Sequence, residues 1–192
     1  VVLFTIAGAT FSLYPAHFED FGKELIAQST LVSNFYFWQQ DGYFAAPSES
    51  QAMLQTWSLS VEEQFYFIFP FLLTWFHTRK NNCPNKTLRS ILLVLLISLT
   101  WSCYGAYKYP TATFFLLPSR AWEMMIGASL ALYKPRYQWN HKLNELISWL
   151  AILTIGYCIY SYDASTPFPG IAALPPCLAA GALIFCNKNK TN

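Results

Sequence analysis

The chain has 192 residues, of which 54% are hydrophobic and only 11% are charged, and its mean hydropathy is +0.28. Soluble domains carry about 25% charged residues, so an ordinary water-soluble globule is excluded, and the 18% aromatic content excludes intrinsic disorder. A net charge of +2 supplies no basic stripe, so nucleic acid is not an expected partner. The composition therefore predicts an all-α, polytopic integral membrane domain.

Runs of about 20 apolar residues indicate candidate membrane spans. The run at 1–14 begins without Met or a charged region, so we expect a truncated first span rather than a signal peptide. Segment 24–38 is short and interrupted by Ser, Thr, Asn and Gln, so it either spans poorly or is partly re-entrant. Segment 61–77 is aromatic-rich and contains Pro70, which membrane helices tolerate. The other predicted spans, which bring the total to six or seven, are 88–107, 121–133, 146–162 and 168–185.

The cysteines and histidines do not form a metal-binding pattern. The five cysteines are scattered singly, with no C-x-x-C pair, and their odd number argues against a complete disulfide framework. None of the three histidines has a cysteine or a second histidine three or four residues away. We therefore expect no metal site and no tightly bound cofactor.

Basic residues concentrate in alternate loops between the predicted spans, and this pattern indicates the orientation in the membrane. Loops rich in Lys and Arg lie on the cytoplasmic side. Loop 15–23 should also be cytoplasmic but has one Lys against two acids. With this orientation, segments 56–64 and 118–123 lie near the outer face at the same depth, where they could face one cavity. The nine basic residues on the predicted cytoplasmic side are Arg79, Lys80, Lys86, Arg89, Lys134, Arg136, Lys142, Lys188 and Lys190.

Glu62 and Glu63 open the predicted span at 61–77 and are candidate catalytic residues. Ionisable groups at membrane depth are costly and tend to indicate function. Adjacent residues point about 100° apart on a helix, so at least one of the two acids should face protein or lipid. The alternative is structural, because Ser60 and Glu63 fit the S-x-x-E capping box of a helix N-terminus.

Arg120 is the candidate cation that would meet these acids or clamp an acyl carbonyl or an anionic substrate group. The alternative to this functional role is a structural one, in which Arg120 forms a simple i,i+3 ion pair with Glu123. Trp57, Trp122 and Tyr66 are either aromatic residues of the membrane interface or a platform for a sugar ring or thioester arm.

Four motifs resemble, in residue type and in their order along the chain, those of the acyltransferase-3 family of polytopic membrane acyltransferases. Residues 54–66, Leu-Gln-Thr-Trp-Ser-Leu-Ser-Val-Glu-Glu-Gln-Phe-Tyr, are similar to the signature of that family. Before it come Ser-Asn-Phe-Tyr-Phe-Trp at 33–38 and Gly-Tyr-Phe at 42–44. After it come Pro-Ser-Arg-Ala-Trp-Glu at 118–123, with Gly-Ala at 127–128, and Phe-Pro-Gly at 168–170, with Ala-Ala-Leu-Pro at 172–175.

This resemblance implies that residues 1–192 are part of one acyltransferase-3 transmembrane domain whose N-terminal helices and C-terminal remainder are missing. The implied location is the bacterial inner membrane. The implied reaction passes an acyl group, most simply acetyl, from cytoplasmic acyl-CoA (acetyl-CoA) to a hydroxyl of an envelope polysaccharide, such as lipopolysaccharide O-antigen or peptidoglycan. Implied partners are membrane lipid, the polysaccharide acceptor and a C-terminal SGNH-type domain in the full protein.

The family also implies a histidine, preceded by an arginine, on a first helix that this chain lacks, and none of its three histidines has the matching context. We therefore expect Glu62 or Glu63 to orient or protonate that histidine and Arg120 to stabilise the acyl carbonyl, and we expect the fragment alone to be inactive. The residues expected to bind substrate are Trp57, Ser58, Gln64, Tyr66 and, on a weaker match, Glu123.

Two other classes of function remain open. A transporter or flippase of an acyl donor or glycolipid would also use a polar outer cavity, although the inverted repeats of many transporters are not visible in this sequence. A non-catalytic scaffold of the same fold would tolerate neutral replacements of Glu62, Glu63 and Arg120.

Overall fold

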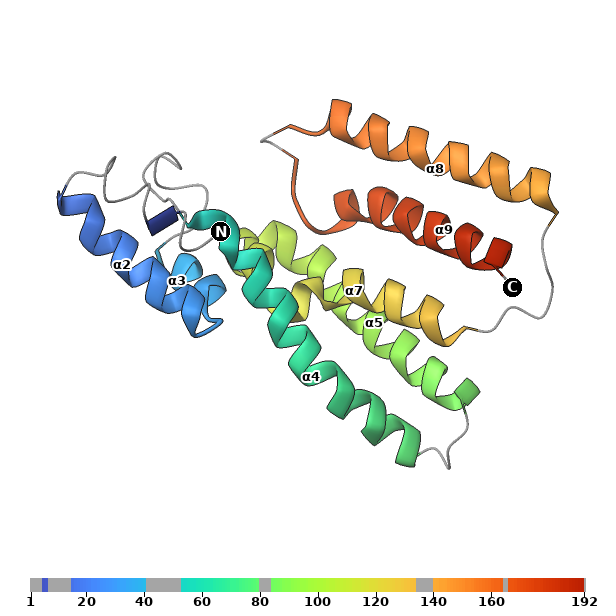
Figure 1. Ribbon diagram of the computed structural model, residues 1–192, viewed down its shortest axis with the longest axis horizontal. Helices are drawn as coiled ribbons and strands as arrows, with labels where there is room; N and C mark the ends of the chain where they lie inside the picture. The colour runs from blue at the N-terminus through green and yellow to red at the C-terminus, as the bar shows by residue number, and fades with distance from the viewer. Residues whose placement is uncertain are drawn as a thin grey trace. The chain divides into compact units, whose positions relative to one another are not determined.

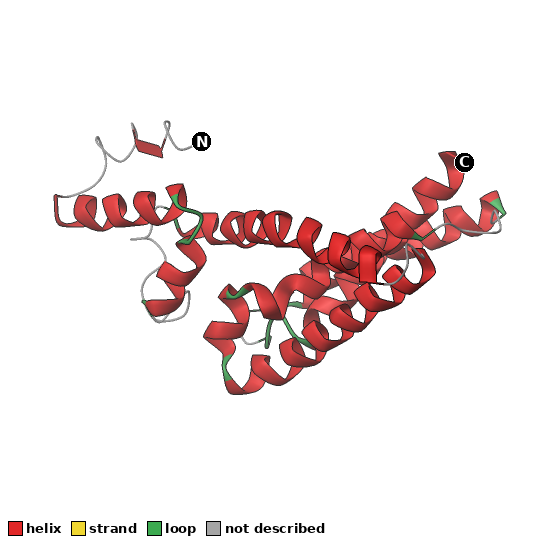
Figure 2. Ribbon diagram, turned by 90° about the horizontal axis from the view of Figure 1, so that it is seen from below, coloured by secondary structure: helices red, strands yellow, loops and turns green. Residues whose placement is uncertain are grey.

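The computed structural model describes residues 5–6, 15–40, 53–79, 84–133, 140–163 and 166–191, and in these ranges every regular element is a helix (Figure 1, Figure 2). The all-α class is therefore confirmed for the described part of the chain. The predicted span at 1–14 lies outside the described residues except for Thr5 and Ile6. The chain divides into two compact units, Val1–Pro70 with Phe115–Leu117 and Phe71–Phe114 with Pro118–Asn192, and each is described by itself.

The described part of the first unit includes two short helices, α2 (Pro15–Ser29) and α3 (Ser33–Gln39). Segment 24–38 is divided between these two helices, because α2 ends before a turn at residues 30–32. Leu31 in this turn has φ 58°, a left-handed conformation that an L-residue with a side chain rarely adopts. The re-entrant alternative for this segment stays a prediction.

The first unit also contains the short 3-10 helix η3 (Leu54–Thr56), which leads directly into α4 (Trp57–Arg79), and the part of α4 up to Pro70 belongs to this unit. A small core forms where Phe21 and Met53 pack with Ile6 and Leu25. The ring of Trp57 meets that of Phe115 edge-to-face, with 5.1 Å between their centroids. These contacts, which involve α2 and the beginning of α4, bury apolar side chains at the start of the signature helix.

The second unit contains α5 (Pro84–Lys108), most of α6 (Pro110–Phe115) and of α7 (Leu117–Leu132), α8 (His141–Ser161), η4 (Ile171–Ala173) and α9 (Leu174–Thr191). Helices α8 and α9 pack against each other and run antiparallel (Figure 1). The Asn140 side chain caps α8 by accepting a hydrogen bond from the backbone N–H of Lys142 at 3.3 Å. The predicted spans at 88–107, 121–133, 146–162 and 168–185 thus coincide largely with α5, α7, α8 and η4–α9.

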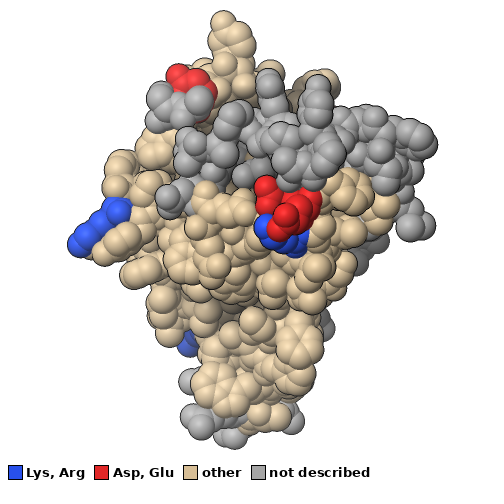
Figure 3. Space-filling model, turned by 90° about the vertical axis from the view of Figure 1, so that its left-hand side faces the viewer, with Lys and Arg blue, Asp and Glu red and all other residues tan. Residues whose placement is uncertain are grey.

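Two helices, α5 over Asn85–Lys108 and α8 over His141–Ser161, are long and apolar enough to cross a membrane, and the apolar part of α9, with η4, is shorter. Helix α8 leaves large apolar side chains uncovered, with Ile159 78% and Tyr160 91% exposed. Among the described side chains drawn on the face in Figure 3, few are charged. These surfaces suit contact with lipid, while the number of spans, six or seven, stays a prediction.

Candidate functional site

The signature motif at 54–66 forms η3 and the start of α4. Backbone and side chain of Thr56 both donate to the carbonyl of Met53, at 2.9 and 2.6 Å, which closes the turn of η3. The helix therefore begins at Trp57, and Ser60 lies within its first turns rather than at its N-cap. The capping-box alternative for Glu63 is thus wrong, because the helix has already begun upstream of Ser60.

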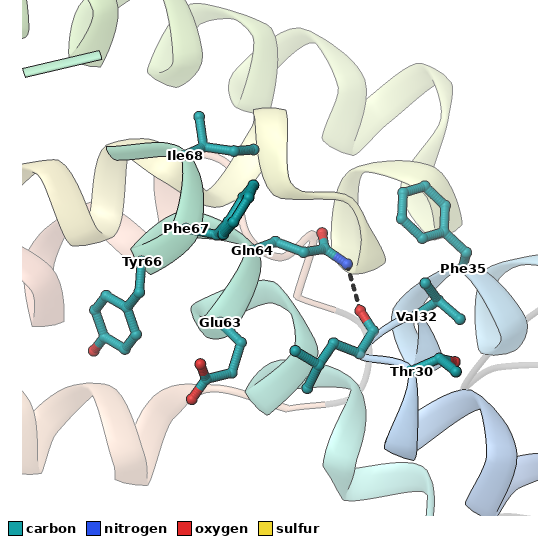
Figure 4. A pocket seen from close by; sticks show the side chains of 9 residues that line it. Thr30, Val32, Phe35, Glu63, Gln64, Tyr66, Phe67 and Ile68 are labelled. Carbon is teal, nitrogen blue, oxygen red and sulfur yellow. Dashed lines mark hydrogen bonds between the residues drawn. The ribbon is translucent and has the colours of Figure 1, made fainter. Parts of the chain in front are cut away.

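Glu62 and Glu63 both lie exposed on α4. Glu63 lines an open groove of about 730 Å³, which α4 forms with the turn between α2 and α3. Figure 4 shows Glu63, Gln64 and Phe67 along α4, with Val32 and Phe35 on the facing segment. The groove is largely apolar, so Glu63 supplies the carboxylate of its lining. Its described lining residues are Thr30, Leu31, Val32, Phe35, Glu63, Gln64, Tyr66, Phe67 and Ile68.

Gln64 joins the two walls of this groove. Its Nε2 donates to the carbonyl of Leu31 at 2.8 Å, the bond drawn in Figure 4, and to Oδ1 of Asn34 at 2.9 Å. Asn34 is 0% exposed, and its Nδ2 donates to Oε1 of Gln64 at 3.4 Å and to the carbonyl of Phe115 at 3.2 Å. The side-chain amide of Gln64 therefore has partners within the protein. Its role in substrate binding stays a prediction.

A second buried polar cluster lies beside this pair. The hydroxyls of Ser33 and Ser60, both 0% exposed, are 2.7 Å apart, and Ser33 also lies 3.0 Å from Oε1 of Gln28. Glu24, which is 3% exposed, accepts a hydrogen bond from the backbone N–H of Met53 at 3.0 Å. These polar groups hold α2 and α3 to the segment that enters the signature helix, because a buried polar group is costly unless it has a partner.

The other predicted binding residues of the first unit differ in exposure. Trp57 is 8% exposed and packs on Phe115, so the interface alternative does not fit its ring. Tyr66 is 59% exposed and lines the groove, which suits either alternative. Ser58 is exposed, and its hydroxyl donates to the carbonyl of Gln55 at 3.2 Å. Direct substrate contact by these three residues stays a prediction.

Arg120 belongs to the second unit, where it forms the i,i+3 ion pair that was its structural alternative. Its Nη2 lies 3.2 Å from Oε2 of Glu123 and its Nε lies 3.3 Å from Oε1, in a two-pronged arrangement. The guanidinium also lies over the rings of Phe114 and Phe168, 5.6 and 5.7 Å from their centroids. The Arg120 side chain is only 16% exposed. Carboxylate and rings together hold the cation in one orientation.

The helix that carries Arg120 is fastened to α5 by Ser98. The Ser98 hydroxyl donates to the carbonyl of Pro118 at 2.6 Å and accepts from the backbone N–H of Trp122 at 3.1 Å. Trp122 is 0% exposed, so its ring fits neither the interface alternative nor an accessible platform for substrate. Ser119, next to Arg120, donates to the carbonyl of Thr113 at 2.6 Å.

The structure thus brings Glu63, Gln64 and Tyr66 to one groove and Arg120 to Glu123. Any meeting of Arg120 with Glu62 or Glu63 stays a prediction, because the two acids and the cation belong to different units. Sequence reasoning missed Glu24, Gln28, Ser33 and Asn34 as individual residues. The signal that could have pointed to these residues was the recurrence of polar residues in the otherwise apolar segment 24–38.

The chain matches the acyltransferase domain family over residues 1–192. It is 28% identical over 185 residues to an uncharacterized protein of Haemophilus influenzae, and the alignment covers 91% of this chain and 74% of that relative. The match to the family over the whole chain confirms the family that the motifs indicate. It also confirms the expected enzyme class, an acyltransferase. No solved structure matches the chain at a significant level.

Several relatives have names that state an activity, and two of them illustrate the similarity. The chain is 26% identical over 155 residues to a putative peptidoglycan O-acetyltransferase, YrhL, of Bacillus subtilis, which covers 76% of the chain and 24% of the relative. It is 29% identical over 126 residues to the peptidoglycan O-acetyltransferase OatA of Listeria monocytogenes, with 64% of the chain and 20% of the relative covered. The chain therefore spans only about a quarter and a fifth of these two proteins.

Proposed function

The chain belongs to the acyltransferase domain family, and on this premise we propose that it is the membrane-embedded part of an O-acyltransferase that modifies an envelope polysaccharide. The proposed donor is cytoplasmic acyl-CoA, with acetyl as the group transferred, and the acceptor is a hydroxyl of peptidoglycan or lipopolysaccharide O-antigen. The name of OatA, a peptidoglycan O-acetyltransferase, supports the acetyl group and the class of acceptor, and the name of YrhL, a putative peptidoglycan O-acetyltransferase, agrees with it.

The observation that carries the proposal is the placement of Glu63 in an open groove. Gln64, the next residue on α4, holds the opposite wall through hydrogen bonds to Leu31 and Asn34. In the net reaction, the acceptor oxygen bonds to the acyl carbon, the C–S bond of the thioester breaks, and the acceptor proton ends on the released thiol. Transfer of that proton needs a positioned base or acid. Glu63 or Glu62 would serve by orienting or protonating the histidine that the family's first helix carries.

Arg120 would stabilise the negative charge that develops on the acyl oxygen. A preorganised cation in a site that excludes water is effective in this role, because it needs no reorientation during the reaction. The ion pair with Glu123 and the rings of Phe114 and Phe168 supply that preorganisation. Glu123 would then act mainly as a positioning residue for Arg120.

The proposed location is the bacterial inner membrane, with six or seven spans and with Glu62, Glu63 and Arg120 near the outer face. The two helices that are long and apolar enough to cross a membrane support this location. The concentration of Lys and Arg in alternate loops supports the orientation. A C-terminal SGNH-type domain in the full protein would complete delivery to the acceptor.

The first test measures ester-linked acetate on envelope polysaccharide in cells that lack their own copy of the gene. The full-length protein is returned as wild type, Glu62→Gln, Glu63→Gln, Arg120→Ala or Glu19→Gln at matched membrane levels. Glu19 is an exposed acid on α2 that pairs with Lys23 at 3.1 Å, so Glu19→Gln is the matched control.

We expect acetate with wild type and Glu19→Gln, and its loss with Arg120→Ala and with at least one signature variant. Equal acetate in all five strains would contradict the proposed catalytic roles and favour the scaffold. No acetate with wild type would contradict O-acetylation itself.

A further inference from the structure

The turn between α2 and α3 forms one wall of the groove at Glu63, and α4 forms the other. The wall formed by the turn and α3 is not held in place by its own helical structure. The turn contains Leu31 at φ 58°, and α3 has only seven residues. Isolated helices of this length are not stable in water, so contacts with other segments must hold α3 in place.

Asn34 and Gln64 supply such contacts. Two of their bonds join the amides reciprocally, at 2.9 and 3.4 Å, and Gln64 Nε2 also reaches the carbonyl of Leu31 at 2.8 Å. A fourth bond, from Asn34 Nδ2 to the carbonyl of Phe115, is 3.2 Å long. Each amide uses both its oxygen and its nitrogen, so the bridge leaves neither group unsatisfied within this part of the protein.

Gln64 also immediately follows Glu63 on α4. Any rotation or shift of α4 relative to the α2–α3 turn would break the bonds of Gln64 and move the Glu63 carboxylate with them. The Asn34 side chain is 0% exposed, so it has no access to a substrate in the groove. Its contribution to the groove is therefore indirect.

We infer that Asn34 and Gln64 form a positioning pair, here called the amide bridge, which sets the width of the groove and the place of Glu63 within it. The inference rests on the proposed function, because it takes the acyl transfer that involves Glu63 as the reaction served. It assigns Asn34 a role that its motif alone does not reveal, and it places Gln64 in the groove wall rather than among the groups that bind substrate.

The test compares steady-state kinetics of full-length protein in detergent, with acetyl-CoA as donor and a soluble peptidoglycan oligosaccharide as acceptor. The variants are Asn34→Ala, Gln64→Ala, the double variant, Glu63→Gln and the exchanged pair Asn34→Gln/Gln64→Asn. Gln39→Ala is the matched control, because Gln39 is an exposed amide on the same short helix as Asn34.

We expect each single Ala variant to lose about 10²-fold in kcat, the cost of a misplacement of about 1 Å, while both KM values stay unchanged. The double variant should lose no more than the worse single variant, because paired residues act as a unit. Gln39→Ala should match wild type. The exchanged pair can still form a reciprocal bridge, so it should recover at least part of the lost kcat.

Several outcomes would overturn the inference. One is a wild-type kcat in folded Asn34→Ala. Another is a raised KM in Gln64→Ala with Asn34→Ala unaffected, which would make Gln64 a substrate-binding residue. If the single variants do not fold, an exchanged pair that folds but has no activity would also overturn the inference. A wild-type kcat in Glu63→Gln removes the reason for positioning that residue.

Failure of the proposed function would give a different result, because wild-type protein would then form no acetyl ester. In that case the amide bridge is tested by thermal unfolding in detergent of the same single and double variants. Non-additive losses of stability support the bridge, and additive losses overturn it.

Discussion

Ser33 shows how single polar residues hold the first unit together. Its hydroxyl lies 2.7 Å from that of Ser60, 3.0 Å from Oε1 of Gln28 and 3.2 Å from the carbonyl of Thr56. One side chain thus links α2, α3 and the signature segment. In a chain with so few charges, short hydroxyl and amide side chains make the cross-links that ion pairs make elsewhere.

Replacement of Ser33 by Ala should lower the free energy of unfolding by about 1–3 kcal/mol, because buried partners lose a hydrogen bond that water cannot replace. Ser29→Ala is the matched control, since Ser29 is exposed and bonds only to the carbonyl of Leu25 in its own helix among the described contacts. Its effect should stay within about 0.5 kcal/mol. Denaturant unfolding in detergent measures both, and equal effects of the two variants would contradict the role of Ser33.

At the scale of residues, the sequence indicates a local ion pair but not the contacts between residues that are distant along the chain. The i,i+3 spacing was enough to identify the pair Arg120–Glu123 as an alternative. The capping box of Ser60 and Glu63 failed because η3 starts the helical turn earlier than the pattern indicates. The Asn34–Gln64 bridge joins residues 30 positions apart, and no local periodicity reports a contact at that separation.

Two helices of the second unit, α5 and α6, approach each other closely at a glycine. Gly105 lies near the end of α5, where a Cβ would collide with the side chain of Thr113 on α6. The missing side chain lets α6 fold back against α5. Gly156 on α8 is different, because a Cβ there would meet nothing within 4 Å.

These two glycines give a matched prediction. Gly105→Ala should destabilise the second unit by about 1–3 kcal/mol, because it overpacks the contact with Thr113. Gly156→Ala should leave stability unchanged or raise it by up to about 1 kcal/mol, since Ala favours helix. Thermal unfolding in detergent checks both, and a loss in Gly156→Ala equal to that in Gly105→Ala would contradict the packing argument.

Among the elements, long apolar helices were predictable and short ones were not. The runs at 61–77 and 88–107 coincide with α4 and α5, because apolar length is a strong signal. The break at residues 30–32 was not predictable, since neither Gly nor Pro marks it. Helix α6, with six residues, is too short to show a period in the sequence.

Orientation in the membrane is a property of the whole molecule, and it is testable without knowledge of the substrate. Single-cysteine variants in a background without the other native cysteines can be labelled in intact cells with a membrane-impermeant maleimide. The positive-inside distribution predicts that Thr166→Cys, in an outer loop, is labelled in intact cells, whereas Cys83 and Gln138→Cys are labelled only after lysis. Labelling of all three in intact cells would contradict the orientation and, with it, the placement of Glu62 and Glu63 near the outer face.

The whole protein is proposed to transfer an acyl group to a hydroxyl by means of the signature acids and Arg120. The most direct measurement places full-length protein in vesicles, with labelled acetyl-CoA on the cytoplasmic side and glycan acceptor on the other. We expect base-labile label on the glycan with wild type and Glu19→Gln, and its loss with Arg120→Ala and at least one of Glu62→Gln and Glu63→Gln. Equal labelling of glycan by every variant, or passage of intact acetyl-CoA without an ester product, would contradict this mechanism.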